Sequence, residues 1–395
     1  MRKQGSLLVV LVAACVALFA ACTPAPVPTT TTTTTTTTVA PVDCAARGPG
    51  VNLSRCDLTG VTLTFADLTG ANLSNANLYS ANLNSVNLTG ANLTGAVLVN
   101  VTFSGVTLTG ANLTEANLSI ARFNYVSSGG ITGTPAALPS GYQITSGYLI
   151  GRNANLYRAD LTRANLFLAD LTVSQLTQAN LTEANLTVAN LSNSNLNDAT
   201  LSNANLTNAN LTNARLYSVN LTRTNLTEAN LTEASLYYAN LTGADLTGAT
   251  LTGVRSVGIT GTPASLPPDN QIINGYIIGP GVNLTNAYLY DANLSGANLT
   301  GANLTEASLN YANLTNANLT GARLYLASMS LADLTGADLT NASLRDANLT
   351  FADLSGANLY GANLTGADLT GVTWSSTRCP NGVVQSTECP RTAAG

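Results

Sequence analysis

Apolar residues recur at every fifth position through most of this chain. The repeating unit reads Ala-Asn/Asp-Leu-Thr/Ser-x, as in residues 71–75 and 297–301, with leucine at the centre and alanine two places before it. A period of five matches neither the 3.6-residue period of an α-helix nor the two-residue period of a β-strand. The pattern therefore predicts an architecture whose own geometry repeats every five residues.

The repeat forms three blocks that are out of phase with one another. The central apolar position runs from Leu53 to Phe123, from Leu156 to Leu251 and from Leu284 to Leu369. Two matching insertions separate the blocks: GITGTPAALPSGYQITSGYLIG begins at Gly130, and GITGTPASLPPDNQIINGYIIG begins at Gly258. Because block and insertion recur together, we interpret the chain as the duplication of a larger module.

The repeat resembles that of the pentapeptide repeat family, over roughly residues 51–375. The resemblance implies an all-β fold, a right-handed quadrilateral β-helix solenoid in which four pentapeptides make one square coil. A short strand followed by a tight turn, repeated, leads to the same shape, with coils ~4.8 Å apart and the right-handed crossover that L-residues favour. We expect leucine and alanine to point inward and fill the lumen, leaving the other three positions in water.

These patterns divide the chain into eight segments. We predict a lipoprotein-type signal peptide (1–21), a disordered Pro/Thr-rich stalk (22–41), an N-terminal cap with the first block (42–124), an insertion (125–155), the second block (156–254), an insertion (255–283), the third block (284–375) and a disulfide-closed C-terminal cap (376–395).

Prolines place part of each insertion outside the sheets, because proline cannot donate to a ladder. We expect excursions over residues 125–143 and 255–271, after which a coil re-enters register with its large and small inward residues exchanged. The insertions are either bulges that join duplicated segments or paired recognition loops that display Tyr142 and its neighbours.

The N-terminus has the features of an export signal. Arg2 and Lys3 precede an apolar run that ends at Cys22, which we expect to be lipidated, although Cys15 also fits the local pattern and a plain secretory peptide is the alternative. This predicts an exported protein on the outer face of the cytoplasmic membrane or the cell surface. The stalk, with ten consecutive threonines, is either a spacer or an O-glycosylated segment.

Four cysteines remain if Cys22 is lipidated and Cys15 is removed, and they form two local pairs. We predict disulfides Cys44–Cys56 and Cys379–Cys389, which would close the two ends, where a β-helix has open edges. Export makes disulfides chemically reasonable. A zinc site is the alternative, but the absence of histidine argues against it.

The inventory of side chains argues against catalysis. The chain has no histidine, and no lysine remains once the leader that contains Lys3 is cleaved, so the common nucleophilic, Schiff-base and metal-ligand arrangements are excluded. Charged residues make up only 9% of the chain. Asp333 and Asp353 should stack one coil apart as a solvated pair, and Arg163 and Glu183 should form a surface ion pair of small energy. We therefore predict no enzyme activity, no cofactor and no metal.

Exposed tyrosines are the candidate binding residues. Tyr217 and Tyr237 fall one coil apart, on the face that carries Tyr157. Such aromatics form either a sugar- or protein-binding strip or a stacked ladder without a partner.

Three functions remain to be compared. The first is a non-enzymatic, cell-surface-anchored scaffold that binds a protein or a cell-wall polymer, with membrane contact through the lipid anchor alone, and as a monomer. The second is recognition of ice or a crystalline polysaccharide by Asn and Thr arrays. The third is DNA mimicry, known in relatives that protect DNA gyrase. A mimic on the order of 60–65 Å long needs on the order of 35 negative charges. The chain has 20 acids, and export separates it from DNA, so we expect no nucleic acid partner.

Overall fold

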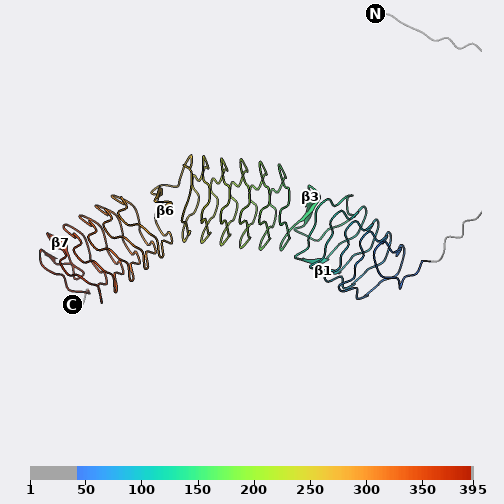
Figure 1. The fold of residues 1–395 in the computed structure, drawn as a ribbon, viewed down its shortest axis with the longest axis horizontal. Coiled ribbons are helices and arrows are strands. Elements are labelled where there is room, and N and C mark those ends of the chain that lie inside the picture. The colour runs from blue at the N-terminus through green and yellow to red at the C-terminus, as the bar shows by residue number, and fades with distance from the viewer. Residues whose placement is uncertain (1–41, 393–395) are drawn as a thin grey trace, which may run out of the picture. The chain divides into compact units, whose positions relative to one another are not determined.

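The computed structural model describes residues 42–392, and the predicted signal peptide, Cys22 and the whole of the predicted stalk lie outside them. Within the described part the chain winds coil upon coil (Figure 1). One residue of nearly every pentapeptide pairs in parallel with a residue of the next coil, twenty places on except at the two hairpins. Asn72 pairs with Asn92, for example, and Asn190 with Asn210. Residues 42–392 contain no helix that is long and apolar enough to cross a membrane.

One pentapeptide makes one side of a coil because it satisfies all five of its backbone N–H groups. In residues 91–95 the alanine N–H closes a turn onto Leu88 O, the asparagine N–H reaches the previous coil, and the leucine and glycine N–H groups reach the next coil. The threonine N–H donates to the side-chain Oδ1 of Asn92. These five donor–acceptor distances lie between 2.8 and 3.1 Å, so no donor of the unit is left unpaired.

The last residue of each unit turns the chain through the corner. It has a positive φ, such as 65° at Gly95 and 58° at Asn75, in the left-handed region that glycine and asparagine tolerate best. The frequent Gly and Asn at this position therefore follow from the turn.

Leucine and alanine are buried along the axis in nearly every unit, while the other three positions are almost all partly or fully exposed. This is the predicted right-handed quadrilateral β-helix, and the fold prediction is confirmed. Phe103 and Phe123 occupy the central position of successive coils, with ring centroids 5.1 Å apart. The larger side chains are thus accommodated by stacking along the axis.

On most sides of the coils only one residue pairs with the neighbouring coil. Eight segments are long enough to form strands. Strand β1 (Thr102–Ser104) pairs in parallel with β2 (Arg122–Asn124). The other strands form antiparallel hairpins: β3 (Gln143–Thr145) with β4 (Tyr148–Ile150), β5 (Gln271–Ile273) with β6 (Tyr276–Ile278), and β7 (Thr377–Arg378) with β8 (Val384–Gln385).

The structure corrects the prediction for the first insertion. Ser127, Thr132 and Ala137 still pair with the coil before them, so most of residues 125–143 follows the solenoid instead of leaving it. The hairpin of β3 and β4 then replaces the fourth side, and Asn155 pairs with Ser127. The expected coil with exchanged inward residues is therefore wrong, because those alternating apolar residues belong to two antiparallel strands.

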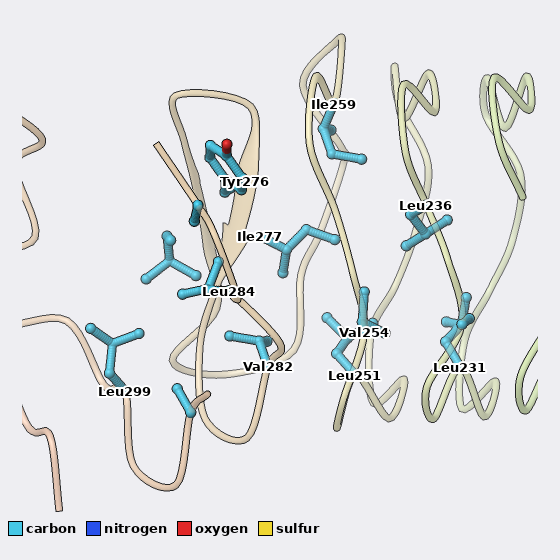
Figure 2. Packing of buried hydrophobic residues seen from close by; sticks show 14 of the residues in the cluster. Leu231, Leu236, Leu251, Val254, Ile259, Tyr276, Ile277, Val282, Leu284 and Leu299 are labelled. Carbon is cyan, nitrogen blue, oxygen red and sulfur yellow. The ribbon is translucent and has the colours of Figure 1, made fainter. Parts of the chain in front are cut away.

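The second insertion follows the same plan, and the same correction applies to residues 255–271. Arg255, Thr260 and Ser265 keep the coil pairing, and the hairpin of β5 and β6 comes before Asn283, which pairs with Arg255. Figure 2 shows Ile277 of β6 directed into the core near Ile259. Hairpin residues thus complete the apolar axis where a pentapeptide is missing.

Both ends of the solenoid carry a disulfide. Cys44 is bonded to Cys56, with a Cα–Cα distance of 5.5 Å, and Cys379 is bonded to Cys389, with a Cα–Cα distance of 5.4 Å. Cys56, Cys379 and Cys389 are buried. Each bond therefore joins the segment beyond the last coil to the end of the apolar axis.

Candidate functional site

Five large apolar side chains lie exposed along successive coils of the third block, and we call them the ridge. Tyr311, Leu331 and Phe351 are twenty residues apart and so occupy one corner of three successive coils, and Tyr288 and Tyr290 precede them. The ridge residues remain 63% (Tyr288), 42% (Tyr290), 50% (Tyr311), 45% (Leu331) and 61% (Phe351) exposed.

The aromatic members of the ridge contact one another. The rings of Tyr288 and Tyr290 are nearly parallel, at 8°, with centroids 6.1 Å apart. The rings of Tyr290 and Tyr311 are 5.3 Å apart and tilted by 54°. The hydroxyl of Tyr276 in β6 accepts a hydrogen bond from the backbone N–H of Tyr288. The start of the ridge is therefore fixed by the second hairpin.

Three ridge residues are held in a backbone conformation that does not suit them. Tyr311, Leu331 and Phe351 have φ values of 61°, 58° and 58°. The left-handed region costs an L-residue with a bulky side chain roughly 1–2 kcal/mol, and glycine avoids this cost. Because these side chains leave about half of their surface in water, burial offsets little of the strain. Leu168 and Leu326 are also exposed at positive φ, so the distinguishing feature of the ridge is that three such residues recur at one corner of successive coils. Their recurrence at a strained, exposed position points to a role outside folding.

The ridge borders a row of carboxylates. Asp333 and Asp353 follow Leu331 and Phe351 by two residues and pair one coil apart, as predicted. The hydroxyl of Thr335, and then its N–H, lower the pKa of Asp333, so this carboxylate stays charged. In residues 42–392 no group of three metal-ligating side chains is assembled.

The predicted tyrosine strip is only partly assembled. Tyr217 makes its ring contact with Tyr238, at 5.3 Å, and no such contact with Tyr237. Tyr237 instead lines an open hollow of about 460 Å³ together with Arg255 and Tyr276. Tyr157 lies three coils before Tyr217, with the Arg158 guanidinium 4.9 Å from its ring centroid. These tyrosines therefore do not form one continuous surface.

Tyr142 is not displayed by its insertion, which corrects the recognition-loop interpretation of this residue. It is half-buried, and its ring lies 5.0 Å from that of Phe123. Its hydroxyl donates to the carbonyl of Arg152 at 2.9 Å. Burial raises the pKa of Tyr142 above its usual value. The residue packs the hairpin against the first block.

The ion pair predicted from the sequence is present. Arg163 Nε lies 2.6 Å from Glu183 Oε2 on the surface of the second block. Counted from the hairpin in each module, these residues occupy the corner positions of Asp291 and Tyr311, so the corner that carries the ridge in the third block carries an ion pair in the second. The ridge itself was missed because the sequence analysis followed the inward positions. Large apolar residues at every fourth corner position, where Gly and Asn predominate, are the signal that would have found it.

Comparison with known proteins identifies the same five-residue repeat. The stacked coils and the exposed ridge define a solenoid built from five-residue repeats. The sequence model for pentapeptide repeats matches eight copies, over residues 50–84, 81–119, 174–213, 214–253, 283–321, 297–336 and 332–371. These ranges cover more than half of the chain, so the chain belongs to the pentapeptide repeat family. Members of this family are generally non-enzymatic interaction scaffolds.

Solved structures of similar proteins include other pentapeptide repeat proteins. HetL, involved in heterocyst differentiation regulation in Nostoc sp. strain PCC 7120, is 26% identical, with 79% of this chain and 93% of that chain covered and a TM-score of 0.19. A protein of the Arabidopsis thaliana thylakoid lumen is 36% identical, with 23% and 65% covered and a TM-score of 0.23. This chain thus spans less than two thirds of the latter protein. No curated protein sequence matches the chain.

Proposed function

We propose that this protein is an exported, lipid-anchored, non-enzymatic scaffold that binds a component of the cell envelope through the ridge. The main supporting observation is that Tyr311, Leu331 and Phe351, exposed although their backbone is strained, recur at one corner of three successive coils. The apolar run before Cys22 supports export and anchoring. The disulfides at the two ends of the solenoid are consistent with an oxidising compartment.

Lattice recognition is the second function raised by the sequence, and side-chain pairing argues against it. The Asn and Thr side chains bond to one another: Thr94 Oγ1 donates to Asn92 Oδ1 at 2.6 Å, and Asn92 Nδ2 reaches Asn72 Oδ1 at 3.4 Å. Such groups have little remaining capacity for an ordered ice or crystal surface.

The scaffold proposal is tested by comparing a variant of the ridge with a variant of an exposed leucine outside the ridge. The triple variant Tyr311→Asn, Leu331→Asn and Phe351→Asn removes the corner row of the ridge and installs a residue that tolerates positive φ. Leu326→Asn is the control, because Leu326 is also exposed, with φ 57°, but lies at a different corner. Purified full chains are sedimented with envelopes isolated from the host cells.

We expect the triple variant to lose at least tenfold in envelope binding while its melting temperature stays level or rises. The control should bind as the parent chain does. If the triple variant binds envelopes as tightly as the parent chain, the ridge is not the contact surface and the proposal fails.

A further inference from the structure

We infer that the ridge binds an uncharged glycan chain that lies along the solenoid axis. This inference rests on the proposed scaffold function and names the class of partner. It follows from the area of the ridge, from the hydrogen bonding of its backbone, from the charges beside it and from its spacing.

The ridge is too small to hold a folded protein or a second copy of this chain. Its members are about half exposed, and aromatic side chains have areas of roughly 150–250 Å², so the five together offer roughly 500 Å². A stable protein interface needs roughly 800 Å² from each partner. A narrow polymer that contacts one side chain per coil needs far less width.

An extended peptide is a poor occupant because the ridge has no free strand edge. The backbone N–H groups of Tyr311, Leu331 and Phe351 already donate to the next coil, at 3.0, 2.9 and 2.9 Å. A peptide laid here could not add to a sheet, and its own amide groups would face apolar side chains without partners. A sugar chain instead places its C–H faces on the rings and turns its hydroxyls toward water.

The charges beside the ridge select against an anionic polymer. The paired positions on the two flanking sides of the coils contain no arginine, and they contain three carboxylates. They are Tyr288, Ser308, Ser328, Asn348 and Asp368 on one side, and Asn293, Asn313, Asp333, Asp353 and Thr373 on the other. Hydrogen bonds from the Thr370 hydroxyl and N–H lower the pKa of Asp368, which therefore stays charged as well.

The spacing of the ridge suits a polymer of ring-shaped units. Its side chains recur once per coil, ~4.8 Å apart, and Tyr290, Tyr311, Leu331 and Phe351 extend over three such steps. A sugar ring in an extended chain is of comparable length, so successive rings can each contact a successive side chain.

Affinity electrophoresis of the purified full chain tests the inference. The gels contain hydroxyethyl cellulose or glycol chitin as the neutral glycan and polygalacturonate as the anionic one. We expect the neutral glycan to retard the parent chain and Leu326→Asn alike. Tyr311→Asn and Phe351→Asn should each weaken binding roughly 2- to 10-fold, the usual effect of losing one aromatic contact. Polygalacturonate should cause no retardation.

The outcomes separate this inference from the proposed function. Retardation by polygalacturonate as strong as by the neutral glycans, or full retardation of the ridge variants, would overturn it. If no glycan retards the chain but the triple variant still loses envelope binding, the glycan inference fails and the scaffold proposal stands. If the triple variant also keeps its envelope binding, both fail.

Discussion

At the scale of single residues, the Asn or Asp before each central leucine explains most of the outward sequence. Its Oδ1 accepts the N–H two residues on, and often the Thr hydroxyl there, which fixes the chain as it enters the corner. Its amide can also reach the same position one coil earlier. The preference for Asn, Asp, Thr and Ser therefore reflects local hydrogen bonding and needs no external ligand.

Removing one such acceptor should destabilise the solenoid measurably. In Asn210→Ala, the N–H and hydroxyl of Thr212 lose their acceptor, and Asn190 loses the amide that now lies 3.2 Å from its Oδ1. We expect the free energy of unfolding to fall by about 1 kcal/mol, measured by urea denaturation. Asn210→Asp keeps the acceptor and should lose less. Equal losses in the two variants would show that the acceptor does not matter.

Asp245 should contribute a pH-dependent part of the stability. A hydrogen bond from Ser265, followed by those from Thr247, lowers the pKa of Asp245 from 3.8 to about 2. Because its folded-state pKa is below the unfolded value, its contribution is fully present above pH 3.8 and is lost as the pH falls toward about 2. Denaturation at several pH values should show a shallower acid loss in Asp245→Asn than in the parent chain. Identical slopes would contradict this assignment.

At the scale of elements, the two hairpins are the parts that the sequence analysis placed wrongly. Their two-residue loops, Ser146-Gly147 and Asn274-Gly275, have positive φ at both positions, as type I′ turns require. Asn-Gly between alternating apolar residues is a strong hairpin signal. Attention to the five-residue period hid it, because Ile144 and Leu149 also fall at positions that fit a shifted repeat.

Glycine at the first hairpin loop should be indispensable. A Cβ at Gly147 would lie 2.9 Å from the backbone nitrogen of Gly130. Gly141 has a similar φ, 81° against 76°, but no atom within 4 Å of a Cβ there. Gly141→Ala should therefore show the backbone strain alone, roughly 1–2 kcal/mol, and Gly147→Ala should lose more. The measurement is thermal unfolding, and a smaller loss in Gly147→Ala would refute the close approach.

The C-terminal disulfide should stabilise the last coils. Replacing Cys379 and Cys389 together by alanine removes a short closed loop, and disulfides of this kind contribute roughly 2–4 kcal/mol. We expect faster hydrogen exchange in the coils next to Trp374, with the first block unchanged. The double variant of Cys44 and Cys56 is the matched control and should affect the opposite end. Unchanged exchange in both variants would mean that the coils need no covalent cap.

At the scale of the whole molecule, anchoring and contact are separate predictions. If Cys22 carries the lipid, Cys22→Ser should move the protein from the membrane fraction into the medium and abolish labelling by a fatty-acid analogue. The ridge variants should keep the label, because the ridge lies in the third block. A Cys22→Ser protein that remains in the membrane fraction would show that the protein is held in another way.

The sequence by itself determined the coil, since one unit satisfies its own backbone donors and buries its own two apolar residues, and twenty residues bring the chain back above itself. It also indicated the cysteine pairs, because each pair is local and lies at one end of the repeats. It indicated the carboxylate pair because a constant period converts sequence distance directly into position. Only the tertiary structure showed the hairpins, the burial of Tyr142 and the partner of the Tyr217 ring. The hairpins replace a pentapeptide that the period would have continued. The burial of Tyr142 and the Tyr217 contact depend on how far a side chain reaches across coils, which the period alone does not specify. Identifying the ridge required both the sequence and the structure. The corner that its residues share follows from the period, while their exposure and backbone strain are properties of the folded chain.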